Sequence, residues 1–184
     1  RLGGYGRATT VKIQPNGRIV VGGIGNGGYF SMLRYLSNGT LDNSFSGDGM
    51  LTTFNGNVAS SALNDLVIQP DGKILVTGEI QPFSSGKYPT SLLIARFNPN
   101  GTLDTTFGTN GRIITSSMQQ RTGKRLALLS DGSFYVGGNE VTYQSFSSQS
   151  QMALSRFTSS GQLVFQKVMT PFVQNYAPNP TSIT

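Results

Sequence analysis

Residues 68–78, IQPDGKILVTG, decide the fold of this chain. Similar stretches precede and follow it: residues 13–23 read IQPNGRIVVGG and residues 128–138 read LLSDGSFYVGG. Each copy holds a short apolar run that ends in an Asn-Gly or Asp-Gly step, which tolerates the positive φ angles of tight hairpin turns. The next run is apolar on consecutive residues, which is typical of a strand covered on both faces. The stretch therefore predicts a β-hairpin with a buried second strand.

A second motif follows each hairpin. It reads LRYLSNGTLD at residues 33–42, ARFNPNGTLD at residues 95–104 and SRFTSSGQL at residues 155–163. The Asx-Gly steps of consecutive hairpins lie 55 and 60 residues apart, and the arginines of consecutive second motifs lie 62 and 60 apart. Such a fixed period is the signature of a repeat architecture. We expect one unit over residues 1–184, with approximate repeats at 8–60, 61–122 and 123–184.

Each repeat is predicted to form four strands. The first and second strands flank the first Asx-Gly turn, and the third and fourth flank the turn of the second motif. The expected strands, in chain order, are 11–14, 18–21, 30–35 and 50–54; then 66–69, 73–77, 92–97 and 113–115; then 126–129, 133–136, 152–157 and 164–169. A four-stranded antiparallel sheet that is apolar on both faces must be stacked between neighbours, and radial stacking of such sheets gives a propeller. The predicted fold is all-β, three four-stranded blades that are part of a β-propeller. A β-solenoid and a sandwich are the alternatives.

The connections predict two different ends of each blade. The Asx-Gly turns are uniformly tight and should lie together at one end, and connections of variable length should lie at the other. The variable connections are residues 24–29, 55–62, 79–91, 116–123, 139–151 and 170–182. Six apolar positions of the first two strands are expected at the interfaces between blades: Ile13, Val20, Ile68, Leu75, Leu128 and Tyr135.

The repeat resembles the delta-60 repeat, a propeller-like family of uncharacterised function in large secreted bacterial proteins. The resemblance covers nearly the whole chain, and the second repeat matches almost throughout, including residues 104–108 (DTTFG). The first repeat departs at Ser46, where the family has Gly. The third has Val164 in place of the Asp and loses the Phe-Gly step. The resemblance implies a fold and brings no activity, cofactor or site residues.

The composition narrows the chemistry that the chain can perform. Cysteine and histidine are both absent, which excludes disulfides, thiolate chemistry and any catalytic triad that uses histidine. The net charge of +6 is spread over 14 basic residues, without the dense basic stripe expected for nucleic-acid binding. No apolar run approaches the roughly 20 residues that span a membrane. The chain begins with Arg1 instead of Met, so we expect a mature or excised fragment, and its Ser-, Thr-, Asn- and Gly-rich composition suits an extracellular or cell-surface bacterial protein.

Repeated polar residues offer candidate sites. Asp42 and Asp104 follow equivalent Gly-Thr-Leu turns, where they could bind calcium, but capping of the turn or ion pairing is the favoured interpretation. Arg34, Arg96 and Arg156 recur in every repeat, which favours an architectural role. Glu79 and Glu140 both follow the second strand and could form a catalytic carboxylate pair, although exposed loop acids are the favoured interpretation. No catalytic residue, metal ligand or cofactor is predicted.

The variable connections contain the aromatic residues that we predict to bind a ligand: Tyr29, Phe83, Tyr88, Tyr143 and Phe146. Aromatic anchors among Ser and Gln suit a protein or glycan partner, and the alternative is that these rings fold back over the blade edges. The predicted function is a non-catalytic binding or structural module. The alternative is an accessory or weakly catalytic segment of a polysaccharide-active enzyme. Three blades do not close a ring, so we expect further blades from a longer chain or from other copies.

Overall fold

The structure, a computed structural model, describes residues 6–53, 58–82, 90–115, 120–144 and 147–169. Its twelve strands form three antiparallel sheets of four, each a meander in chain order. The first blade comprises β1 (Arg7–Ile13), β2 (Ile19–Ile24), β3 (Phe30–Tyr35) and β4 (Met50–Thr52), with a 3-10 turn, η1 (Asn26–Gly28), before β3. The second comprises β5 (Val58–Ile68), β6 (Ile74–Pro82), β7 (Ser91–Phe97) and β8 (Arg112–Ile114). The third comprises β9 (Gln120–Leu128), β10 (Phe134–Gln144), β11 (Ser147–Phe157) and β12 (Leu163–Val168).

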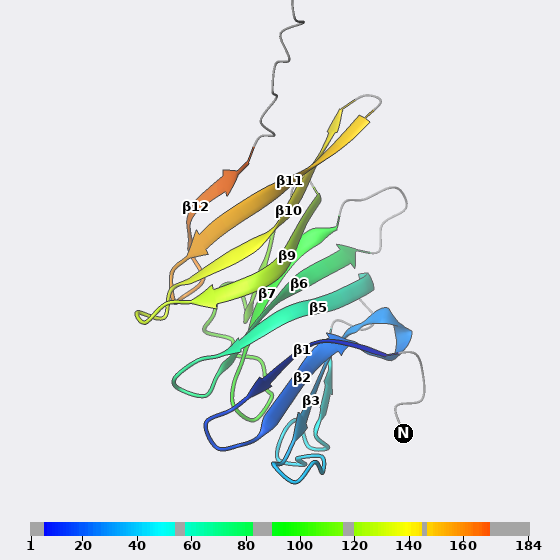
Figure 1. Ribbon diagram of the computed structural model, residues 1–184, viewed down its shortest axis with the longest axis vertical. Helices are drawn as coiled ribbons and strands as arrows, with labels where there is room; N and C mark the ends of the chain where they lie inside the picture. Colours follow the sequence, from blue (N-terminus) through cyan, green and yellow to red (C-terminus); the bar gives the residue numbers. More distant parts are fainter. Residues whose placement is uncertain (1–5, 54–57, 83–89, 116–119, 145–146, 170–184) are drawn as a thin grey trace, which may run out of the picture.

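The three blades are stacked face to face and fan out, with the first and third at opposite ends of the stack (Figure 1). The second blade lies between them, because β5 contacts β1, β2 and β3 on one side and β9 on the other. This arrangement confirms the predicted fold: the molecule is all-β, and its blades form part of a β-propeller. Within the described residues, no helix is long and apolar enough to cross a membrane.

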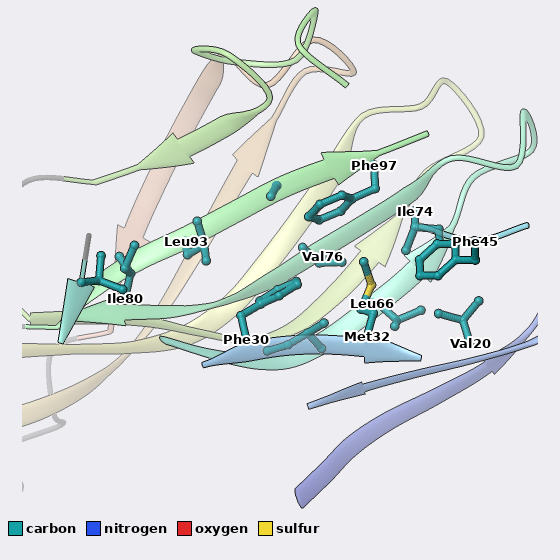
Figure 2. Packing of buried hydrophobic residues seen from close by; sticks show 13 residues of the cluster. Val20, Phe30, Met32, Phe45, Leu66, Ile74, Val76, Ile80, Leu93 and Phe97 are labelled. Carbon is teal, nitrogen blue, oxygen red and sulfur yellow. The ribbon is translucent and has the colours of Figure 1, made fainter. Parts of the chain in front are cut away.

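Each blade has a front face, directed toward the following blade, and a back face, directed toward the preceding one. The first interface joins the front face of the first blade to the back face of the second. Figure 2 shows its cluster, in which Phe30 and Met32 from β3 lie against Val76, Leu93 and Phe97. The rings of Phe30 and Phe97 stack with centroids 5.9 Å apart. The second interface repeats this arrangement with Leu75 and Phe107 from the second blade and Phe134 and Phe157 from the third.

The expected interface positions are partly confirmed. Val20 and Leu75 are fully buried, and Ile68 and Leu128 are partly buried against the two clusters. The prediction is wrong for Ile13, which is 72% exposed on the back face of the first blade, and for Tyr135, which is half-buried on the front face of the third. Both residues occupy the repeat positions of residues that are buried or partly buried in the other blades, but no neighbouring blade covers their faces in the described structure.

The ends of the strands correct the expected loops. The strands next to the variable connections run further than predicted: β10 and β11 stay paired from Phe134↔Phe157 out to Gln144↔Ser147, and β5 begins at Val58. Parts of five predicted connections are therefore strand, because polar residues such as Gln149 and Ser150 complete the backbone ladder. The tight turns do lie together, since a Cβ at Gly72 would be 3.4 Å from Pro99 in the other turn of that blade.

Candidate functional site

The repeated arginine and aspartate form an ion pair in the first two blades. The Nε of Arg34 donates to Oδ2 of Asp42 at 2.8 Å, and Arg96 makes the same contact with Asp104 at 2.7 Å. A second cation from the hairpin turn supports each carboxylate, Arg18 at 3.2 Å and Lys73 at 3.3 Å. The architectural role predicted for the arginines and the ion pairing predicted for the aspartates are therefore confirmed in these blades.

The other oxygen of each aspartate caps the turn that follows. Oδ1 of Asp42 accepts hydrogen bonds from the backbone N–H and the hydroxyl of Ser44, and Oδ1 of Asp104 accepts the same pair from Thr106. Burial works to raise the pKa of Asp104, but the hydrogen bonds from Thr106, Arg96 and Lys73 outweigh it and hold the pKa well below its ordinary value. Both oxygens are thus occupied by donors of the protein itself.

The segment that begins with each aspartate reaches the next blade. We call residues 42–49 and 104–111 the latches. The N–H of Ser46 in the first latch donates to the carbonyl oxygen of Asn100 at 2.8 Å, and Gly108 in the second donates to that of Ser160 at 3.1 Å. The arginine completes the contact, because Arg34 donates to the carbonyl of Pro99 and Arg96 to that of Ser159 at 2.9 Å.

A buried phenylalanine fills the centre of each latch. Phe45 and Phe107 are fully buried, and the guanidinium carbons of Arg34 and Arg96 lie 4.7 Å from their ring centroids. Each ring lies against a glycine of the next blade, where a Cβ would come within 3.0 Å of Phe45 at Gly101. The Asp-x-x-Phe spacing is visible twice in the sequence, but the sequence does not show that the ring belongs to the neighbouring blade's core.

Residues 120–144 and 147–169, the described part of the third blade, contain no such latch. Val164 occupies the position of the aspartate, and β12 begins at Leu163, so the chain continues directly into the fourth strand. Arg156 keeps its place beside Tyr135, with its guanidinium carbon 5.8 Å from the ring centroid. Its Nε is buried and has no hydrogen-bond partner, while its Nη2 lies 4.0 Å from Oδ2 of Asp131. The third blade therefore presents the arginine of the repeat without its carboxylate.

The two candidate glutamates are both paired with cations. Glu140 is only 4% exposed and accepts hydrogen bonds from Arg121 at 2.9 Å and Gln166 at 2.8 Å. Glu79 accepts from Lys124 of the third blade at 3.4 Å. The favoured interpretation of both residues as exposed loop acids is wrong: Glu140 is buried, and Glu79 lies within β6 with its side chain 30% exposed. The place of Glu140 in an extended β10, between β9 and β11, explains its burial.

A third set of contacts joins the first strands of the blades, and sequence reasoning missed it. Asp65, which is 7% exposed, accepts hydrogen bonds from the Thr10 hydroxyl of the first blade at 3.1 Å and from the Leu126 N–H of the third at 3.0 Å. The adjacent Asn64 donates to the carbonyl of Gly123 at 2.8 Å. A β-bulge between Leu63 and Asp65 turns these side chains toward the neighbouring blades.

The predicted ligand-binding aromatics are only partly placed. Tyr29 is half-buried, packs against the first cluster and lies over Gly27, where a Cβ would be 2.9 Å from its ring. Phe83, Tyr88 and Phe146 lie outside the described residues, and Tyr143 lies near the end of β10 away from Gly132, with its side chain outside the description. The structure brings none of these rings together within its described residues, so the ligand-binding role stays a prediction.

Comparison with known proteins supports the repeat. Residues 14–45 and 69–107 match the family model described as a domain of unknown function (DUF5122) β-propeller. Each matched segment runs from the first hairpin turn to the phenylalanine of a latch, Phe45 or Phe107. The chain is thus similar to a β-propeller repeat, and the matched segments contain the turn, the arginine and the first four residues of each latch. No curated protein matches the chain.

Proposed function

We propose that the chain is a non-catalytic structural and binding module of a secreted or cell-surface bacterial protein, with repeats of the delta-60 type. The observation that carries this proposal is the use of its acids. All eight acidic side chains accept hydrogen bonds from other residues of the chain: Asp42, Asp48, Asp65, Asp71, Glu79, Asp104, Asp131 and Glu140. A carboxylate that caps a turn or joins two blades already uses its oxygens as acceptors within the protein. A catalytic acid or base must instead exchange a proton with the substrate.

The contact surface in this proposal is the end of the blades that carries the variable connections. The opposite end consists of tight turns and latches whose donors and acceptors are used within and between blades. At the variable end, β6, β10 and β11 extend beyond the apolar clusters and carry exposed polar side chains, among them Gln81, Asn139 and Gln149. Long strands hold connections of different length on a rigid base, which is how many binding surfaces are built. The partner class we propose is a glycan or a protein.

A glycan array and a panel of polysaccharide substrates test this proposal on the full chain. We expect binding without turnover, and we expect Tyr88→Ala and Tyr143→Ala to weaken it. Ser130→Ala, at the opposite end of the third blade, is the control and should leave binding unchanged. Turnover of a polysaccharide that is lost in Glu79→Gln would overturn the non-catalytic assignment and favour the enzyme alternative. Loss of binding in the Ser130 variant would place the contact surface at the end of the tight turns, and would contradict the proposed surface.

A further inference from the structure

The interface between blades occurs twice in the chain and uses equivalent residues each time. Each interface joins the front face of one blade to the back face of the next, so a face that carries the same residues can be recognised as one half of such an interface. The back half, in the second and third blades, consists of apolar rows that cross the strands, such as Ile68, Ile74 and Phe97 or Leu128, Phe134 and Phe157. The front half consists of apolar residues together with the arginine of the repeat. The apolar residues are Val20, Phe30 and Met32 in the first blade and Leu75, Leu92 and Ile94 in the second.

The back face of the first blade carries the same apolar rows in the open. One row is Ile13, Ile19 and Tyr35, and the other is Val11, Val21, Leu33 and Met50, which pair in register across all four strands. Val11 is 59% exposed, Ile13 is 72% exposed and Met50 is 39% exposed. A contiguous apolar face of this kind is rare on a protein surface that has no partner.

This face also contains an empty receptor position. Gly39 has a φ of 85° and is equivalent to Gly101 and Gly161, whose Cβ positions would meet the rings of Phe45 and Phe107. Nothing lies within 4 Å of the corresponding point at Gly39. The back face of the first blade thus has the shape of a blade acceptor, and none of the described residues occupies it.

The front face of the third blade is the complementary half. Leu154 is 39% exposed and Met152 is 64% exposed, although the equivalent Ile94 and Leu92 of the second blade are buried. Gly137 has nothing within 4 Å of its Cβ position, whereas at the equivalent Gly22 a Cβ would strike Leu63 of the next blade. The buried Nε of Arg156 has no partner. This face therefore has open space at Gly137 and a guanidinium whose Nε has no hydrogen-bond partner.

We propose that the front face of the third blade binds the back face of the first blade of a second copy. The interfaces inside the chain give the register. Val11, the counterpart of Leu66, lies near Gly137 as Leu66 lies near Gly22. Arg156 lies at the carbonyl of Ser37, as Arg34 lies at that of Pro99. Such a contact joins two different surfaces, so it either closes into a ring or grows into a filament. The described blades of two copies would number six, within the four to eight that propellers contain.

This junction differs from the internal ones because it lacks a latch. Val164 removes the carboxylate, and no phenylalanine of the described third blade fills the space at Gly39. The junction therefore relies on apolar burial and one arginine, and it is weaker than the two interfaces inside the chain. Its dissociation is consequently measurable at experimental concentrations.

Sedimentation of the full chain tests the contact. We expect a species of twice 19.6 kDa that dissociates on dilution. Ile13→Glu and Leu154→Glu should each abolish it, because a charge at either half must be desolvated. Ile114→Glu is the matched control, since Ile114 is also exposed (45%) but lies at the outer edge of the second blade, and it should leave association intact.

Mixing the two monomeric variants separates a head-to-tail contact from a symmetric one. Each variant keeps one intact half, so the mixture should form a dimer through a single junction. A chain that stays monomeric at every concentration, or one in which only Ile13→Glu prevents association, would overturn the proposal. A chain that stays monomeric would indicate that the back face of the first blade binds a latch-bearing blade of another protein. Association that only Ile13→Glu prevents would indicate that the back faces of two copies contact each other.

Cysteine cross-linking provides a second measurement that does not depend on charged variants. The chain contains no cysteine, so Val11→Cys and Gly137→Cys introduce the only thiols. The double variant should cross-link between copies with a short bismaleimide, and neither single variant should do so efficiently. Cross-linking that is equal in the single Val11 variant would contradict the head-to-tail register.

Discussion

Replacing Leu75 by alanine tests whether β6 is packed on both of its faces. Leu75 is fully buried in the second cluster, together with Phe107 and Phe134. The substitution removes three carbon atoms, which at about 0.8 kcal/mol per buried methylene costs about 2.4 kcal/mol. The cavity left between two rigid sheets adds to this cost, so the expected loss is about 3–5 kcal/mol. A domain with a total stability of about 5–15 kcal/mol would lose a large part of it.

Urea unfolding of the wild-type chain and the variant, followed by circular dichroism, measures this loss. Leu154→Ala is the control, because it makes the same chemical change at a position that is 39% exposed. We expect the control to cost less than about 1 kcal/mol at protein concentrations where the chain is monomeric. A loss below about 1 kcal/mol for Leu75→Ala as well would refute the stacking of the second blade against the third.

Two further predictions concern the second latch. Phe107→Ala is expected to destabilise the chain by about 3–5 kcal/mol, because it empties the space beside Gly161, and an effect no larger than that of Phe165→Ala would contradict the latch. Asp104→Asn tests the ion pair with Arg96. Since the pKa of Asp104 is lowered by folding, its contribution is complete above the unfolded value of about 4 and is lost as the pH falls toward the folded pKa. Denaturant unfolding at several pH values should therefore show a difference between wild type and variant that is largest near neutrality and shrinks below about pH 4; a difference independent of pH would contradict the ion pair.

The repeat and its turns were predictable because they depend on local chemistry. The Asx-Gly steps require glycine at positive φ, as at Gly72 with a φ of 81°, and consecutive apolar residues such as Ile74 and Leu75 mark strands buried on both faces. An architectural role for Arg96 and a capping or ion-pairing role for Asp104 were also predictable, since both residues recur at fixed spacing, but their pairing with each other was not. These signals lie within one repeat, so they can be recognised without knowing how the blades are stacked.

Features that depend on the neighbouring blade were not predictable. Periodicity places Ile13 on the back face of its blade, but it cannot show whether a neighbour covers that face, and the residue is 72% exposed. The extended strands β10 and β11 carry few apolar residues at their outer ends, so their pattern resembles a loop. The role of Phe45 depends on a glycine of the next repeat. The contact between them becomes visible only when the blades are stacked.

The direction of the latch has a consequence for synthesis. Arg34 bonds a carbonyl 65 residues further along the chain, and Arg96 bonds one 63 residues further. At about 5–20 residues per second, the acceptor of each latch leaves the ribosome roughly 3–13 s after its arginine. A newly made blade therefore waits with an open front face until the next hairpin arrives. Codon choice in the segment between Arg34 and Pro99 would thus set how long an incomplete interface is exposed to aggregation.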